Sequence, residues 1–297
     1  MAPPGSARRP PLPRVVNLFC FLATVVTTLV AGTLLTIDDH SWATLCDIFT
    51  SPSYWSLGLP YSLSILLILG THEMGHYVAC RLYGIEATLP FFIPSPFPFG
   101  TFGAVIRIRS PFTTRRALFD VGIAGPIAGF IVAVPVLLLG LSLSTIARQP
   151  PRADSIPLGG YLLTEILGRL FFGGGGSASI DLHPVYVAGW VGLLATSLNL
   201  MPLGQLDGGH VLYSLSPRVH RAVSRFGSPA LIVVGLSIGG YHLVTFGILF
   251  AILGLGHPPT LQEGDRLGSA RVLVAAAALL IFILCFIPVP IPPDSLR

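Results

Sequence analysis

Long apolar runs, separated by short polar segments, make up most of the chain. A membrane-spanning helix needs about 20 consecutive, predominantly apolar residues. The pattern therefore predicts an all-α polytopic membrane protein with about six transmembrane helices. The runs cover residues 15–36, 59–83, 117–143, 183–206, 226–262 and 272–289. The fifth run is long enough for either one tilted helix or two short ones.

The segment that follows the second run, residues 88–110, departs from this pattern. Its four prolines exclude a helix, and residues 104–109 end in the alternation of apolar and charged residues that is typical of a strand. Non-helical backbone is tolerated at membrane depth only against protein or a water-filled cavity. We therefore expect a small membrane-associated β-hairpin or re-entrant loop beside the functional site. An apolar surface loop is the alternative.

The apolar runs predict a single transmembrane domain over residues 15–290, with its core at residues 59–215. Residues 1–14 are rich in proline and arginine and are expected to form a disordered tail, and residues 291–297 form a C-terminal tail. Residues 144–182 are expected to form a loop with one short amphipathic helix. This loop is too short for an inserted globular domain of the usual size.

The composition agrees with a membrane protein. Hydrophobic residues make up 52% of the chain and charged residues 10%, and the mean hydropathy is +0.77. Soluble domains carry about 25% charged residues, so a soluble enzyme with one anchor is excluded and a lipid bilayer is the expected surrounding. The net charge of +4 comes from arginine alone, without a basic stripe, so no nucleic-acid partner is expected. The four cysteines form no C-x-x-C pair, which argues against a disulfide framework or a cysteine metal site.

The second run contains the motif H-E-x-x-H, from His72 to His76. On a helix, His72 and His76 lie on the same face, where two neutral imidazoles can take two corners of a tetrahedral zinc site. Glu73 can then act as general base on a water molecule rather than as a ligand. A carboxylate near the bilayer centre costs roughly 2.5–3.5 kcal/mol on insertion scales, so its presence there indicates a function.

A catalytic zinc usually takes three protein ligands and a water molecule. Asp207 is the favoured third ligand, because Pro202 and Gly204 break the helix of the fourth run and the glycines after Asp207 let the backbone approach another element. His210 is the second choice. The other candidates are His183, His242, His257, Asp120 and Glu86.

Two further polar residues lie in apolar runs. Asp120 is expected to cap its helix or to pair with Arg115 or Arg116 rather than to bind metal. Asn199 can hold the carbonyl or the backbone of a substrate, or it can bridge two helices.

The sequences T-H-E-M-G-H and N-L-M-P-L-G-Q-L-D-G-G together resemble the two signature motifs of the site-2 protease family, the intramembrane zinc metalloproteases. G-I-A-G-P-I-A-G, between them, also resembles that family, and the similarity covers residues 62–213. The resemblance implies one zinc ion bound by His72, His76 and Asp207, with Glu73 as general base. It also implies hydrolysis of peptide bonds in or near transmembrane segments of membrane-protein substrates, as in regulated intramembrane proteolysis. Many relatives carry a PDZ domain, for which no segment here has room.

The arginines predict the orientation. With the N-terminus inside and six spans, 12 of the 17 arginines lie on the inner side. The second and fourth runs then point the same way, so both motifs reach the inner side and the active site faces the cytoplasm. The compact chain without lysine indicates a bacterial cytoplasmic membrane, with an organelle membrane as the alternative.

A helical substrate hides its carbonyls in hydrogen bonds and must unwind, and the expected strand at residues 104–109 can hold the unwound segment by strand addition. Two other functional classes stay open, a divalent-metal transporter and a catalytically silent binding protein. The polar groups gather toward one side of the membrane instead of lining a path, and every expected catalytic residue type is present. Both observations favour the protease. The substrate, the trigger and the oligomeric state are not encoded in these patterns.

Overall fold

The computed structural model describes residues 14–37, 42–96, 99–146, 158, 160–172, 180–238, 240–253 and 267–286. Of the expected N-terminal tail, only Arg14 is described, and it already belongs to the first helix. The expected C-terminal tail lies outside the described residues, and so does the end of the fifth apolar run.

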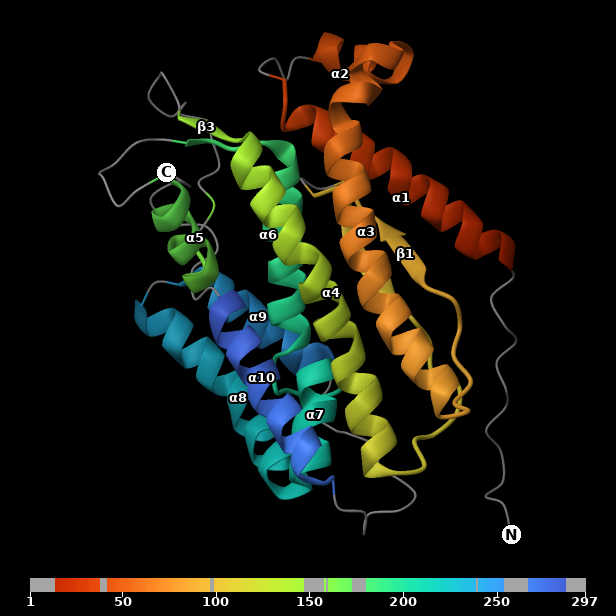
Figure 1. Cartoon of the computed structure of the whole chain (residues 1–297), viewed down its shortest axis with the longest axis vertical. Helices are drawn as coiled ribbons and strands as arrows, with labels where there is room; N and C mark the ends of the chain where they lie inside the picture. The colour runs from red at the N-terminus through yellow and green to blue at the C-terminus, as the bar shows by residue number, and fades with distance from the viewer. Residues whose placement is uncertain are drawn as a thin grey trace.

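The described part of the chain is mostly helical, as Figure 1 shows. The helices are α1 (Arg14–Leu34), α2 (Trp42–Thr50), α3 (Pro52–Leu82), α4 (Arg115–Leu143), α5 (Leu162–Phe172), α6 (Pro184–Asn199), α7 (Asp207–Leu215), α8 (Pro217–Ile238), α9 (Tyr241–Leu253) and α10 (Ser269–Cys285). The fifth apolar run therefore forms two helices, α8 and α9, in its described part. The short helix expected within residues 144–182 is α5.

Three helices in the described part are long and apolar enough to cross a membrane, namely α1 from Val15 onward, α3 and α4. Two apolar helices are shorter, namely residues 243–252 of α9 and the whole of α10. The helical membrane-protein architecture is thus confirmed. A total of six spans stays a prediction, because α6 has only 16 residues and the chain then breaks before α7.

The core lies among α3, α4 and α6, and α1 covers the outer side of α3 (Figure 1). Figure 1 also shows that α3 and α6 run in the same direction and that α4 runs in the opposite direction. Large buried side chains fill the space between these helices: Tyr61, Ile65, Ile68, Leu137, Leu193 and Trp190. Because α3 and α6 are parallel, the H-E-x-x-H motif and the start of α7 come to the same end of this core.

A β-hairpin follows α3, as expected. Strand β1 (Phe91–Pro94) pairs antiparallel with β2 (Thr101–Val105), with Phe91 opposite Val105 and an irregularity between Phe92 and Pro94. The second strand begins earlier than the expected residues 104–109, because pairing starts at Thr101 and only an isolated bridge from Ala87 to Ile108 continues it. A second, two-residue pairing joins β3 (Thr145–Ile146) and β4 (Ile180–Asp181).

The hairpin is held against α1. The hydroxyl of Thr27 donates a hydrogen bond to the main-chain oxygen of Gly100 at 2.6 Å, and the rings of Phe21 and Phe92 meet edge to face with centroids 5.2 Å apart. Gly100 has φ +70°, and a Cβ there would lie 2.5 Å from the main-chain oxygen of Thr27. A glycine therefore allows the turn and the close approach to α1 at the same position.

Candidate metal centre

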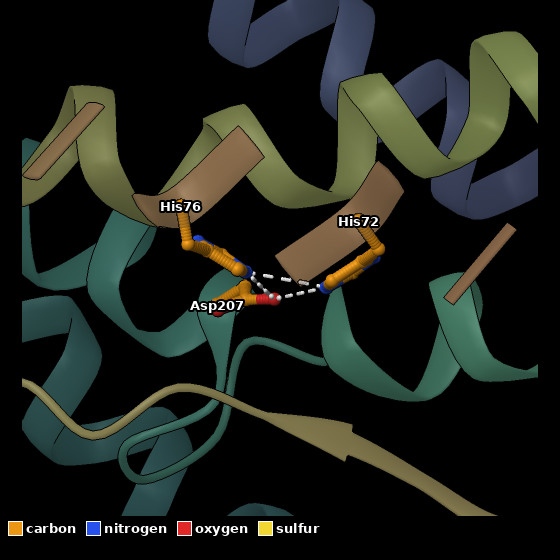
Figure 2. Close-up of side chains that lie close together, drawn as sticks. All are labelled: His72, His76 and Asp207. Atoms are coloured by element: carbon orange, nitrogen blue, oxygen red, sulfur yellow. Dashed lines mark hydrogen bonds and ion pairs between the residues drawn. The ribbon is translucent and has the colours of Figure 1, made fainter. Parts of the chain in front are cut away.

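Three side chains from two helices meet at one point, as Figure 2 shows: His72 and His76 from α3, and Asp207 from the first position of α7. The Nε2 atoms of the two histidines lie 3.2 Å apart. Asp207 Oδ2 lies 3.3 Å from Nε2 of His72 and 3.2 Å from Nε2 of His76. These three atoms thus form a nearly equilateral triangle.

This triangle has the size of one face of a zinc coordination tetrahedron. With zinc–ligand bonds of about 2.0–2.1 Å, neighbouring ligand atoms in a tetrahedron lie about 3.3–3.4 Å apart. Imidazole nitrogen and carboxylate oxygen are both zinc ligands. His72 is 4% exposed and His76 is 6% exposed, so their imidazoles are removed from water. Buried polar groups of this kind need a hydrogen-bond partner or a metal ion. The donor set and its spacing fit a zinc ion.

The second ring nitrogen of His76 sets the orientation of its imidazole. The Nδ1–H group donates a hydrogen bond to the main-chain oxygen of Val121 in α4 at 2.7 Å. With Nδ1 protonated, the lone pair of Nε2 faces His72 and Asp207. This is the usual arrangement of a metal-binding histidine, whose other nitrogen is held by a carbonyl or a carboxylate.

Glycines of α4 make room for the two imidazoles. A Cβ on Gly125 would lie 2.1 Å from His76 Nε2, and one on Gly129 would lie 3.0 Å from His72 Nδ1. These glycines belong to the motif G-I-A-G-P-I-A-G, and small residues at this spacing suit close helix contact. In the structure the motif brings the α4 backbone against the two histidine rings.

Asp207 reaches the histidines because the chain folds tightly before α7. A Cβ on Gly208 would lie 1.9 Å from the main-chain oxygen of Leu200, and one on Gly209 would lie 2.5 Å from that of Gly204. The two glycines after Asp207 therefore let the preceding loop, residues 200–206, lie directly on the first turn of α7. Gly122 of α4 receives the other side of α7, since a Cβ there would lie 2.8 Å from the Cβ of His210.

Two more residues complete the surroundings of the histidines. Glu73 is 7% exposed and lies near the main chain of Ile106, which directly follows β2. Asn199, at the end of α6, places its Nδ2 atom 3.2 Å from His72 Nε2. The hairpin and α6 thus both contact this site, and Asn199 links α6 to α3.

Comparison with known proteins identifies the group to which the chain is related. The model of Peptidase family M50 matches residues 60–239. The chain belongs to Peptidase family M50. The resemblance of its motifs to those of the site-2 proteases is thereby confirmed.

Two of the curated proteins that the chain resembles come from a plant. The "Probable zinc metalloprotease EGY1, chloroplastic" of Arabidopsis thaliana is 31% identical over 238 residues, which are 78% of this chain and 43% of that protein. The EGY2 protein of the same plant is 35% identical over 191 residues, which are 61% of this chain and 32% of that protein. The M50 chain thus spans less than half of the length of each of these two relatives.

A solved structure, "Site-2 Protease from Methanocaldococcus jannaschii", aligns with a TM-score of 0.39 and 18% identity over 81% of this chain and 92% of that chain.

The expected bacterial cytoplasmic membrane is wrong for this M50 chain. The relatives from Arabidopsis thaliana and Oryza sativa carry the description "chloroplastic". The error has a physical reason. Arginine distribution reports which loops face the inner side of a membrane, but neither it nor the absence of lysine tells which membrane that is.

Among the side chains that the structure describes, the other sequence candidates do not join the three converging residues. His210 packs its ring against Phe112, with centroids 5.9 Å apart. His183 caps α6, where its Nδ1 atom accepts a hydrogen bond from the Val185 N–H at 3.2 Å. The side chain of Glu86 is not part of the group. His242 lies in α9 with an undescribed side chain, and His257 lies outside the described residues.

Asp120 has a different partner from the one expected. Its carboxylate pairs with Arg271 of α10, with an Oδ2–Nη2 distance of 2.6 Å, and it accepts a hydrogen bond from the Tyr83 hydroxyl. Burial, aided by the adjacent Asp120, raises the pKa of Tyr83 and keeps this donor protonated. Thr114 caps α4, and Arg115 binds the main-chain oxygens of Ser214 and Leu215. The expected pairing with Arg115 is therefore wrong, because that guanidinium is used at the end of α7.

Proposed function

We propose that the chain is an intramembrane zinc metalloprotease that hydrolyses peptide bonds in or near transmembrane segments of membrane proteins. The observation that carries the proposal is the convergence of His72, His76 and Asp207 next to the buried carboxylate of Glu73. Two histidines and a carboxylate, with a neighbouring acid, are the groups that metal-assisted hydrolysis of a peptide bond needs. Membership in Peptidase family M50 supports the same reaction.

One zinc ion per chain is proposed, held by His72, His76 and Asp207. When bound there, zinc polarises the scissile carbonyl and lowers the pKa of a water molecule toward about 7. The protein groups around the three ligands then carry out the remaining tasks. The Val121 carbonyl keeps His76 in the tautomer that exposes Nε2, and the α4 glycines keep both rings in place.

Glu73 is proposed as the general base. It lies next to one proposed ligand on α3, and its burial places it away from bulk solvent. The Glu73 carboxylate takes the proton of the attacking water and returns it to the leaving amine. Asn199 touches His72 and is a candidate for holding the carbonyl or the backbone of the substrate.

The β-hairpin is proposed to hold the unwound substrate segment by strand addition. Two features support this role. The main chain of Ile106 contacts Glu73, so the hairpin passes beside the site. Phe102 and Val105 of β2 are 66% and 48% exposed, so apolar side chains of the hairpin are available to a second apolar segment.

The plant relatives support a chloroplast membrane as the location, with transmembrane proteins of that membrane as substrates. Expression of a tagged chain in plant cells followed by fractionation tests this proposal. Recovery in washed chloroplast membranes is expected, and recovery in another membrane fraction contradicts it.

The activity itself is tested by comparing membrane-protein fragments from cells that carry the wild type or Glu73→Gln, using mass spectrometry of new N-termini. Met74→Leu serves as a control, because Met74 is the neighbouring, 39% exposed position of the same helix. Fragments that begin in or beside transmembrane segments are expected with the wild type and Met74→Leu, and not with Glu73→Gln. Identical profiles under several stresses would favour the silent protein, and zinc flux into vesicles would favour the transporter.

A further inference from the structure

The loop that carries Asp207 into the site is fixed from outside by two buried polar side chains of α8. The imidazole Nε2–H of His220 donates a hydrogen bond to the main-chain oxygen of Gly204 at 2.9 Å. The Gly204 N–H donates a hydrogen bond to the hydroxyl of Ser224 at 3.0 Å. His220 Nε2 and Ser224 Oγ lie 3.2 Å apart, one helical turn from each other.

These contacts hold both polar backbone groups of one residue, Gly204, which are its N–H and its carbonyl oxygen. His220 and Ser224 are each 0% exposed. A buried backbone group without a partner destabilises the fold, so the loop is favoured in the one position where both Gly204 groups are satisfied. Gly204 has φ +53°, a conformation that glycine adopts without strain.

Gly204 packs directly against the first turn of α7, so its position affects the position of that turn. The Gly204 oxygen lies against Gly209, where a Cβ would come within 2.5 Å. The other end of the same helix is held by Arg115, whose Nε donates to the main-chain oxygen of Ser214 at 2.9 Å. Helix α7 has only nine residues, so fixing both ends leaves Asp207 little freedom to move relative to α3.

We propose that His220 and Ser224 are positioning residues that set the place of Asp207 relative to His72 and His76. Their side chains make no hydrogen bond to the proposed ligands within the described residues, and they act through Gly204 and the first turn of α7. The inference rests on the proposed role of Asp207 as a metal ligand. It assigns a task to a histidine and a serine that no motif of the metal site contains.

The test measures zinc affinity of the purified 297-residue chain in detergent, by competition with a chelator of known affinity. The variants are Ser224→Ala, His220→Leu and His220→Gln. A matched control is Ser228→Ala, because Ser228 lies one turn further along α8, is 1% exposed and makes no hydrogen bond through its hydroxyl within the described residues. Asp207→Ala serves as the reference for loss of the proposed ligand itself.

Ser224→Ala and His220→Leu are expected to weaken zinc binding about tenfold, at the lower end of the effect of outer-shell partners on metal affinity. His220→Gln is expected to recover most of the loss, since its amide can donate to the Gly204 oxygen, and Ser228→Ala is expected to bind as the wild type does. The visible spectrum of the Co²⁺-loaded protein is expected to change in Ser224→Ala and His220→Leu, because the carboxylate meets the ion in an altered geometry.

Three other results separate the possible failures. If Asp207→Ala weakens zinc binding and both Ser224→Ala and His220→Leu bind as tightly as the wild type, the positioning role is overturned and the metal site stands. A lower thermal stability of the metal-free variants with unchanged affinity also overturns the positioning role, because it indicates packing alone. If Asp207→Ala itself leaves zinc affinity unchanged, the proposed ligand set is wrong and the inference is overturned with it.

Discussion

His76 Nδ1 lies 2.7 Å from the main-chain oxygen of Val121, across the contact between α3 and α4. This hydrogen bond joins the second histidine of the H-E-x-x-H motif to the glycine-rich helix. The ring can occupy that position only because Gly125 has no side chain. Packing of α4 and orientation of the His76 ring are therefore coupled.

Gly125→Ala is expected to displace the His76 ring, because the new Cβ would lie 2.1 Å from Nε2. Overpacking of this kind costs about 1–3 kcal/mol, and zinc affinity should fall at least about tenfold through loss of the histidine orientation. Thermal unfolding in detergent and chelator competition measure the two effects. Gly168→Ala in α5 is the control, since a Cβ there meets nothing within 4 Å. Normal zinc affinity of Gly125→Ala would contradict the coupling.

Asp207→Ala is expected to weaken zinc binding strongly, whereas His210→Ala is expected to leave it nearly unchanged. The two residues lie three positions apart on the same short helix, but only the aspartate approaches the Nε2 atoms of His72 and His76. Metal content after dialysis against a chelator distinguishes them. The reverse order of effects would transfer the proposed role to His210.

Glu73→Gln is expected to keep its zinc and to lose turnover. The amide is nearly isosteric with the carboxylate and can still contact the Ile106 main chain, but it cannot accept a proton from water. A loss of about 100-fold to 10,000-fold in rate is the usual contribution of a general base. Cleavage of a purified transmembrane substrate, measured beside the zinc content of the same sample, checks both parts. Retained cleavage at full zinc occupancy would remove Glu73 from the proposed role.

Val105→Pro is expected to reduce cleavage without loss of zinc. Val105 is the last residue of β2 and lies opposite Phe91, so proline there removes a main-chain donor at the end of the hairpin. Val105→Thr keeps that donor and the branched shape and serves as the control. Substrate cleavage and zinc content are measured for both variants. Equal cleavage by the proline and threonine variants would argue against strand addition.

How much the sequence predicts depends on how local the relationship is. His72 and His76 share a face because helical geometry alone places residues four apart together. Asp207 is favoured because proline and glycine end the preceding helix near it. The contact between Asn199 and His72 spans 127 positions, and the pair of Asp120 and Arg271 spans 151. No spacing rule reaches across such separations, because helix packing decides them.

The offset of the hairpin has a local cause that alternation of residue types does not report. The pattern of apolar and charged residues indicates a strand from Ala104 to Arg109, but pairing starts at Thr101. The turn is set by Gly100, whose positive φ and contact with Thr27 of α1 fix where the second strand begins. The register is thus determined by a neighbouring helix.

The proposed ligands lie in two distant parts of the chain, with 135 positions separating His72 from Asp207. A bound ion would therefore act as a cross-link between the first half of the protein and the second. Ligands that bind only the folded state stabilise it by mass action, so zinc would favour chains in which α7 has already docked on α3 and α4. A chain with a misplaced α7 would offer only the two histidines and would bind zinc more weakly. Zinc content would then distinguish correctly assembled chains from misassembled ones.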